Sequence, residues 1–289
     1  MLTRLGGVCA ALLITLAPNL ANAQDKHPAI WTIKDADTTI YLFGVAHALT
    51  PDVTWFQGTV KSAFDSSQEL VLEVLEPPPE EVKRIVMNSR TSDTRPMIER
   101  LSADVRPLYT QRLADFGIPP NAFDSFDPWF AILNLGALSV RRAGYDGNLS
   151  GEHVLSAAAR EQGKAVVGLE TPEQQFSYFK SPPVTEQIAA LERSLREPDR
   201  TAEVMKSIAK HWLNGESDAV ATEMNAELRS PAFRKTLITD RNVRWAKWIE
   251  HRMETPGTVF VAVGAGHLDG PENLRAALKK NGIPSTRID

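Results

Sequence analysis

Cysteine is almost missing from this chain, because the single one among its 289 residues is Cys9, in an apolar amino-terminal segment. The remainder can therefore form no disulfide, no cysteine nucleophile and no thiolate metal site. No later segment reaches the roughly 18 consecutive apolar residues of a membrane-spanning helix, so no transmembrane span is expected in the mature chain. The chain has no basic run and a formal net charge of −4, which leaves nucleic-acid binding without an electrostatic basis.

Several common catalytic motifs are missing as well. The sequence contains no H-E-x-x-H zinc-peptidase helix, no G-x-S-x-G nucleophile turn, no Walker phosphate loop and no dinucleotide-binding glycine pattern. Any enzymatic activity must therefore rest on a less familiar arrangement of side chains.

The first 23 residues have the pattern of a secretory signal peptide. Arg4 precedes an apolar stretch over residues 8–16, and Ala21-Asn22-Ala23 is typical of a cleavage site. We therefore predict an exported protein, periplasmic or secreted, whose single domain covers residues 24–289.

Short apolar strands alternate with long helical blocks in the rest of the chain. Strands are expected at 31–34 and 39–43 (a hairpin), 69–75, 165–169, 258–263 and 285–288. Helices are expected at 51–67, 80–88, 98–142 with a break near 117–120, 153–163, 173–250 and 274–281. Asp127 is expected to cap the helix that begins at Pro128. This order favours one α/β domain, a central mixed sheet flanked by helices, with a largely helical insertion.

One short pattern occurs twice, each time directly after an apolar strand. Residues 44–47 read GVAH and residues 264–267 read GAGH. Polar side chains that follow the carboxyl ends of strands gather at one edge of an open sheet, so His47 and His267 are expected to share a site. Each glycine is explained either by a sharp turn that needs a positive φ or by a close approach of the backbone to a ligand.

Two glutamates lie in or directly after predicted strands. Glu73 is in the middle of LVLEVL, where a buried carboxylate needs a metal ion, a cation or a histidine as its partner. A structural pair with a buried arginine is the alternative. Glu170 follows VVGL and is expected to be either catalytic or an N-cap for the helix near Pro172.

Arg241 and Asn242 follow one another in the helical block. Arg241 can neutralise Glu73 or Glu170, bind a substrate carboxylate, or form an ordinary surface ion pair. Asn242 can donate a hydrogen bond to a developing oxyanion. Asp146 and His153 are weaker candidates. The two histidines and nearby carboxylates form a set of N and O ligands that suits Mn²⁺, Co²⁺, Zn²⁺ or Fe²⁺.

The quoted segments resemble the TraB/GumN/TIKI superfamily, in its bacterial GumN-like, TraB-domain branch. The resemblance spans almost all of residues 28–289 and rests on five segments: WTIKDADTTIYLFGVAHALTPDVTW, ELVLEVL, GKAVVGLETPEQQ, RNVRWAKWI and VFVAVGAGHLDGPENLRAALKKNGI. It implies a fold similar to the erythromycin-esterase and haem-binding ChaN proteins, and a divalent metal held by His47, Glu73 and His267 with Glu170, Arg241 and Asn242 in support. The animal TIKI members are membrane-tethered, Mn²⁺- or Co²⁺-dependent peptidases that trim Wnt ligands. Where many relatives read Gly-Val-Asp or Gly-Val-Glu, this chain reads Gly151-Glu152-His153, so a role for that acid is left open.

Three functions follow as hypotheses. The first is an exported metal-dependent hydrolase of peptidase type, acting on a peptide or another small polar substrate, with Glu170 as general base and Arg241 and Asn242 binding substrate or oxyanion. The second is a metal-independent hydrolase in which a histidine is itself the base. The third is a non-catalytic protein that binds haem, a peptide or an envelope glycan, with the tryptophan-rich block 173–250 as the wall of its pocket.

Overall fold

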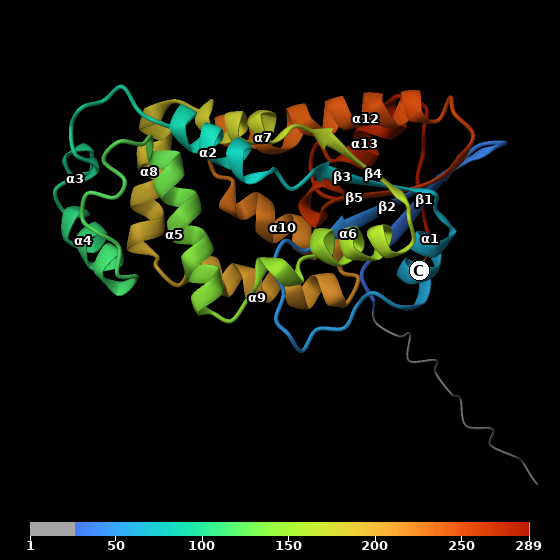
Figure 1. Ribbon diagram of the computed structural model, residues 1–289, viewed down its shortest axis with the longest axis horizontal. Coiled ribbons are helices and arrows are strands. Elements are labelled where there is room, and N and C mark those ends of the chain that lie inside the picture. Colours follow the sequence, from blue (N-terminus) through green and yellow to red (C-terminus); the bar gives the residue numbers. More distant parts are fainter. Residues whose placement is uncertain (1–26, 289) are drawn as a thin grey trace, which may run out of the picture.

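The centre of the protein is one mixed sheet of six strands (Figure 1). A computed structural model describes residues 27–288, and the predicted signal peptide lies outside this described part. The strands are β1 (Ile30–Lys34), β2 (Thr38–Val45), β3 (Glu69–Val74), β4 (Ala165–Glu170), β5 (Gly257–Gly264) and β6 (Thr286–Arg287). All of the predicted strands are confirmed, with bounds that differ by one or two residues.

The sheet has the strand order β4-β3-β5-β2-β1-β6. The strands β4, β3, β5 and β2 run parallel to one another, whereas β1 is antiparallel to both of its neighbours. The carboxyl ends of the four parallel strands therefore lie at one edge of the sheet. The first and last parts of the described chain meet there, since β2 and β5 are neighbours.

Helices account for most of the remaining residues. They are α1 (Gly58–Ser66), α2 (Pro79–Asn88), α3 (Met97–Arg100), α4 (Arg106–Asp115), α5 (Pro128–Arg142), η1 (Gly147–Leu149), α6 (Gly151–Glu161), α7 (Pro172–Lys180), α8 (Val184–Arg196), α9 (Arg200–Leu213), α10 (Ser217–Glu227), α11 (Pro231–Arg234), η2 (Lys235–Thr239), α12 (Asp240–Arg252), η3 (Ala265–His267) and α13 (Leu274–Lys280). This confirms the predicted α/β class and the helical content of residues 173–250.

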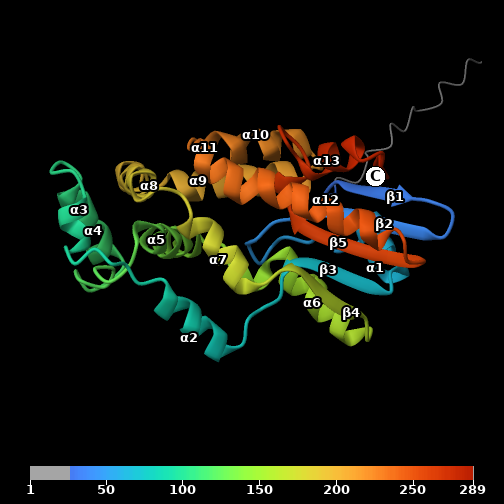
Figure 2. The same ribbon diagram turned by 90° about the horizontal axis from the view of Figure 1, so that it is seen from above.

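Apolar residues cover both faces of the sheet, so helices pack on each. On β3, Leu70 and Leu72 contact the cluster that includes Phe64 of α1 and Leu155 of α6. Val71 points the other way, into the cluster that contains residues of α12 and α13. Figure 1 shows α12 and α13 above the strands and α1 and α6 below them, and in Figure 2, seen from above, α12 lies in front of the strands. The strand period of two therefore decides which face each side chain of β3 meets.

A separate helical part extends from one end of the sheet layer. Its core is formed by buried residues of α3, α4, α5 and α8, among them Met97, Tyr109 and Leu191. Figure 1 shows these helices at the end of the molecule away from the sheet. None of the helices in residues 27–288 has the length and apolarity needed to cross a membrane.

Two local predictions are wrong. The helix expected over 51–67 is only α1, because the preceding segment is a turn and loop in which buried Trp55 stacks on Phe43 with ring centroids 5.4 Å apart. Asp127 precedes α5 and Pro128 occupies its first turn as expected, but the Asp127 side chain makes no capping hydrogen bond.

Candidate functional site

The two Gly-x-x-His segments meet at the carboxyl edge of the sheet. In the parallel pairing of β2 and β5, Gly44 lies opposite Val263 and Val45 lies opposite Gly264. Because the two strands end almost in register, His47 and His267 emerge side by side from neighbouring strands. This register brings the two turns together, as predicted from the sequence.

The positive φ expected as one explanation of the two glycines is wrong, and both glycines lie close to other groups of the protein. Neither Gly44 nor Gly264 is among the glycines with positive φ. A Cβ on Gly264 would lie 2.7 Å from Nε2 of His47 and 3.1 Å from Oε1 of Glu73. A Cβ on Gly44 would lie 2.9 Å from Cα of Ala265. These distances leave no room for a side chain, so glycine lets the groups of the site come together.

Glu73 lies on β3 and is 5 % exposed. Its Oε1 accepts a hydrogen bond from the backbone N–H of Gly264 at 2.6 Å, and its Oε2 accepts one from Nη2 of Arg241 at 2.5 Å. Burial acts to raise the pKa of Glu73, but the Arg241 guanidinium and the other nearby donors outweigh it and lower the pKa to about 2. The buried carboxylate is therefore ionised at neutral pH.

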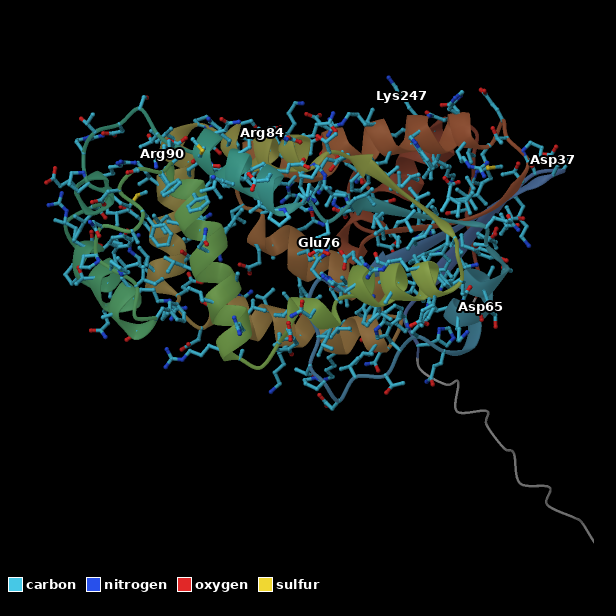
Figure 3. All side chains as sticks on the ribbon, viewed as in Figure 1. Asp37, Asp65, Glu76, Arg84, Arg90 and Lys247 are labelled. Carbon is cyan, nitrogen blue, oxygen red and sulfur yellow. The ribbon has the colours of Figure 1, made fainter. Side chains whose placement is uncertain are left out.

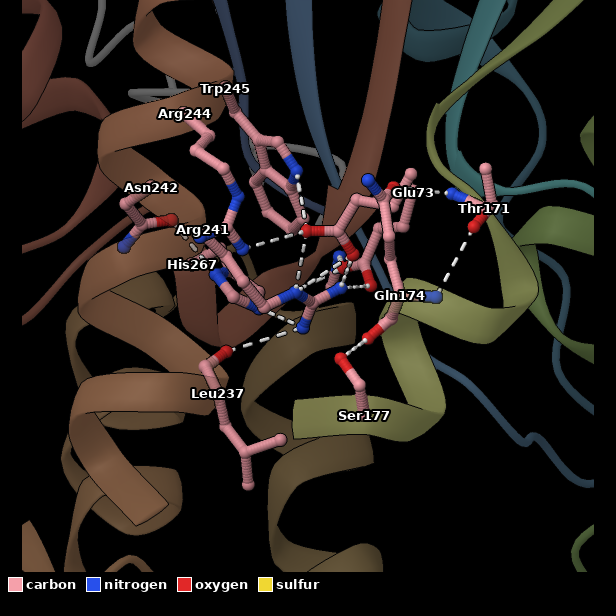
Figure 4. Close-up of polar contacts among 12 residues, drawn as sticks. Glu73, Thr171, Gln174, Ser177, Leu237, Arg241, Asn242, Arg244, Trp245 and His267 are labelled. Atoms are coloured by element: carbon pink, nitrogen blue, oxygen red, sulfur yellow. Dashed lines mark hydrogen bonds and ion pairs between the residues drawn. The ribbon is translucent and has the colours of Figure 1, made fainter. Parts of the chain in front are cut away.

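Arg241, on α12, joins the two predicted glutamates (Figure 4). Its Nη2 lies 2.5 Å from Oε2 of Glu73 and 2.9 Å from Oε2 of Glu170, and its Nε contacts both oxygens of Glu170 at 3.0 and 3.1 Å. Arg241 is 6 % exposed, so the expectation of a surface ion pair is wrong. One guanidinium serves two buried carboxylates, which is possible because its planar fork offers five donors.

Glu170 is held in place on three sides. Besides Arg241, it accepts a hydrogen bond from Nε1 of Trp245 at 3.1 Å and lies 3.5 Å from Nη2 of Arg244. The N-cap expectation for Glu170 is wrong, because Thr171 caps α7 with a complete capping box. Glu170 therefore acts on Arg241, and through it on Glu73.

His267, in η3, is 4 % exposed, and both of its ring nitrogens have partners. Nδ1 lies 2.8 Å from Oδ1 of Asn242, and Nε2 lies 3.2 Å from Nη1 of Arg241 and 3.8 Å from Oε1 of Glu73. Burial, together with the charge of Arg241, lowers the pKa of His267 to about 3. The ring is therefore neutral at pH 7, with its proton on Nδ1, because an amide oxygen accepts and a guanidinium donates.

His47 meets the opposite conditions. Its side chain is 54 % exposed, and its Nδ1 lies 2.5 Å from Oε1 of Glu152, in the first turn of α6. The Glu152 carboxylate raises the pKa of His47, to about 9, against the smaller lowering effect of desolvation. His47 and Glu152 thus form a histidine–carboxylate pair whose Nε2 is directed away from Glu152.

A cavity of about 690 Å³ lies in front of this pair. Of the predicted site residues, it is lined by His47, Glu73, Asp146 and His153, while Glu170, Arg241, Asn242 and His267 lie behind them, outside its lining. Glu76 also lines the cavity, and in Figure 3 it lies near the middle of the molecule while the other labelled charged residues lie around the rim. The predicted residues therefore form two layers, one open to a ligand and one buried.

Two residues of the site were not singled out from the sequence. In the sequence, Glu152 stands out only as a departure from the pattern of relatives, and the available signal is its position as an acid at the start of a helix. Trp245 is one of several tryptophans in the helical block, and its spacing of four from Arg241 places both on one helix face. The Trp245 ring lies 4.5 Å from both the Arg241 guanidinium and the His267 ring centroid.

The fold and the site together define an α/β protein with paired Gly-x-x-His turns at the edge of its sheet. The profile of the TraB/PrgY/gumN family matches residues 29–287, and the chain belongs to this family. The predicted family relationship is therefore confirmed.

The chain is also similar to individual proteins. It is 28 % identical over 202 residues to the uncharacterized protein YbaP of Escherichia coli (strain K12), a match that covers 65 % of this chain and 73 % of that protein. The YbaP protein of Shigella flexneri gives the same figures. An uncharacterized protein of Treponema pallidum (strain Nichols) is 20 % identical over 295 residues, covering 94 % of this chain and 86 % of the relative. No solved structure matches significantly, so the likeness to esterase and ChaN folds stays a prediction.

Proposed function

We propose that this protein is a hydrolase of peptidase type, assisted by a divalent metal ion, with its active centre where His47 and Glu73 border the large cavity. One observation carries the proposal. Nδ1 of His47 is hydrogen-bonded to Glu152, and Nδ1 of His267 is hydrogen-bonded to Asn242. The Nε2 atoms of both histidines therefore lie on the side of Glu73. An oxygen acceptor on the far nitrogen is the usual support of a metal-ligating histidine.

The donor set fits a metal ion in chemistry and in tautomer. Two imidazole nitrogens and one ionised carboxylate suit Mn²⁺, Co²⁺ or Zn²⁺. The structure does not place the three groups around one point. Across residues 27–288, no three histidine, aspartate or glutamate side chains are close enough together to bind a metal ion. Nη1 of Arg241 also donates a hydrogen bond to Nε2 of His267, and this occupies the lone pair that a metal ion would need. Ligation by His47, Glu73 and His267 therefore remains a proposal.

A bound ion would polarise the scissile carbonyl and lower the pKa of a water molecule. The protein's own groups have separate tasks. Arg241 and Glu170 hold Glu73 ionised and in position, and Asn242 holds the ring of His267. We assign the role of general base to Glu152 in place of Glu170, since Glu152 lines the cavity and its buried Oε2 has no hydrogen-bond partner within the described chain.

The cavity suits a polar, extended substrate such as a peptide. Its volume lies within the range typical of ligand sites, and its lining combines carboxylates with the half-exposed His47. The carboxylates Glu73, Glu76, Asp146 and Glu152 outnumber the single arginine, Arg160. We therefore expect substrates with a positively charged group to be preferred over acidic ones.

A second candidate is direct acid–base hydrolysis without a metal. The hydrogen bond of Arg241 with His267 favours this candidate, because His47 and Glu152 then form a pair that does not depend on His267. Glu152 would hold Nδ1–H while Nε2 of His47 takes a proton from water, as in histidine–carboxylate hydrolases. With the pKa of His47 raised to about 9, such activity would increase as the pH rises toward 9.

Metal analysis combined with peptide hydrolysis separates the two candidates. The purified protein would be loaded with Mn²⁺, Co²⁺ or Zn²⁺, and its ion content and its cleavage of a peptide library measured for wild type, His47→Ala, His267→Ala and the control His251→Ala. His251 is a suitable control because its side chain is 84 % exposed. The metal-dependent proposal expects about one ion in wild type and control and none in the other two variants. Hydrolysis that survives chelation but is lost in His47→Ala supports the second candidate, and the lack of both ion and hydrolysis contradicts both.

A further inference from the structure

A second cavity lies in the helical part of the protein. Its volume is about 270 Å³, and it is enclosed by residues of α5, α7, α8, α9, α10 and α11 together with η2. It shares no lining residue with the cavity at His47. The two cavities are therefore separate sites, and a ligand of this one takes no part in the proposed hydrolysis.

The wall of this second cavity is mainly apolar. Trp129, Phe179 and Phe233 supply aromatic surface, and Leu133 and Leu237 supply aliphatic surface. Trp129 and Phe233 are themselves buried, at 2 % and 7 % exposure, and the rings of Trp129 and Phe179 are stacked with centroids 6.4 Å apart. Such a wall favours an apolar chain over a sugar or a nucleotide.

One buried donor in this wall has no acceptor. Nε1 of Trp129 has no hydrogen-bond partner among the described residues, although the side chain is almost completely buried. Most buried tryptophan N–H groups find an acceptor, and leaving one unpaired is unfavourable.

The lining of the second cavity carries an excess of positive charge in a protein of negative net charge. Arg200 is paired with Glu227 at 2.7 Å. Arg193 and Arg229 make no ion pair with any residue of the described chain, while Glu197 contributes one negative charge nearby. Three arginines against two glutamates give the lining a net positive charge, which suits a ligand with one anionic end.

We propose that this cavity binds a single-chain carboxylate, a fatty acid of medium length, with its chain against the aromatic wall and its head at Arg193 and Arg229. The volume corresponds to about nine water molecules, which limits the occupant to one short chain. Haem, one of the ligands that the sequence suggests for the block 173–250, does not fit this cavity. Among the described residues of the lining there is no histidine, cysteine, methionine or tyrosine to ligate its iron.

Titration calorimetry with decanoate tests the proposal, using the full protein. Ala190→Phe fills the cavity, and Ala189→Phe adds the same side chain at an exposed neighbouring position of α8 as the matched control. We expect Ala190→Phe to weaken decanoate binding at least tenfold and Ala189→Phe to leave it unchanged. Circular dichroism would verify that both variants are folded.

The charged head is tested separately with an exposed residue, so that folding is not at risk. Arg229→Ala should weaken decanoate binding several-fold and leave the binding of decanol unchanged, whereas Arg141→Ala, outside the cavity, should change neither. The proposal is wrong if wild type does not bind decanoate, or if both phenylalanine variants bind it as well as wild type does. It is also wrong if Arg229→Ala weakens the binding of decanol as much as the binding of decanoate. Because peptide hydrolysis is measured at the other cavity, failure here leaves the proposed function untouched.

Discussion

The two Gly-x-x-His turns of this protein have the same local sequence pattern and opposite environments. His267 is enclosed by Arg241, Asn242 and the Trp245 ring, and the pKa of its imidazole is lowered to about 3. His47 is more than half exposed beside Glu152, and its pKa is raised to about 9. One histidine is neutral at pH 7 and the other is charged when the site holds no ligand.

The difference comes from the nearest charged partner of each ring. A guanidinium and burial disfavour the imidazolium of His267, whereas a carboxylate favours that of His47. A shared motif therefore specifies where a histidine is placed and leaves its protonation to residues from other parts of the chain. The buried turn serves as a fixed support, while the open turn is the one that can exchange protons with a substrate or give them up to a metal ion.

The largest effect is expected from removing the cation on which the buried turn depends. Arg241→Met leaves Glu73 and Glu170 buried without their shared partner, and it should lower the free energy of unfolding by about 3–5 kcal/mol. Urea unfolding measures this. Arg244→Met removes a 47 % exposed partner of Glu170 and should cost less than about 1 kcal/mol. Equal losses in the two variants would contradict the view of Arg241 as the centre of the buried network.

The pH dependence of the free energy of unfolding should report on the buried, neutral His267. The pKa of His267 is about 3 in the folded protein, below its ordinary value of 6.5, so the unfolded chain binds the proton more readily. The contribution of His267 to the free energy of unfolding is complete above pH 6.5. It is lost as the pH falls toward 3, and the loss amounts to about a few kcal/mol. Unfolding free energies measured between pH 6.5 and 5 should fall in wild type and in the exposed control His251→Gln. In His267→Gln this part of the slope should disappear, and an unchanged slope would show that His267 is not buried in its neutral form.

Adding one methyl group between the turns tests their contact. In Gly264→Ala the new Cβ would meet Nε2 of His47 and Oε1 of Glu73, so we expect a loss of about 1–3 kcal/mol and loss of any activity of the site. Gly136→Ala on α5 is the matched control, since nothing lies within 4 Å of its Cβ position and alanine favours a helix by about 0.5–1 kcal/mol. Thermal unfolding compares the two. A harmless Gly264→Ala would mean that the turns are further apart than described.

The smallest effect on stability is expected at the open turn, where the change is electrostatic. Glu152→Gln should lower the pKa of His47 from about 9 toward its ordinary value, followed by NMR titration of the ring, while His267 stays unchanged. A raised histidine pKa adds stability below pH 6.5 that is lost as the pH rises through about 9, and this contribution should vanish in the variant. Glu76→Gln, which removes an 81 % exposed charge at the same cavity, should shift His47 far less. Similar shifts in both variants would refute a specific His47–Glu152 pair.

Much of the site could be predicted because its pieces follow strand ends. Strand-like runs before Gly44 and Gly264, and a glutamate within LVLEVL, already indicate side chains at one edge of a sheet. The joint role of Arg241 could not be predicted, since it depends on how α12 packs over β3 and β4, far away in the sequence. For the same reason the sequence does not reveal the role of Glu152, because its partner His47 lies 105 positions away. The segment 51–57 was misassigned because the stacking of Trp55 on Phe43 overrides its local preference.

The sequence by itself determined the α/β class, the family, and the placement of two histidines after apolar strands and one glutamate within another. These features depend on short-range patterns, namely apolar runs of strand length and the glycines that end them. Tertiary structure alone decided which histidine is buried, which acid holds each ring and which residues face a cavity. Charge and solvent exposure at a site are set by groups that meet only when the chain is folded, so the same four-residue turn became a neutral support at one end of the chain and a charged, open imidazole at the other.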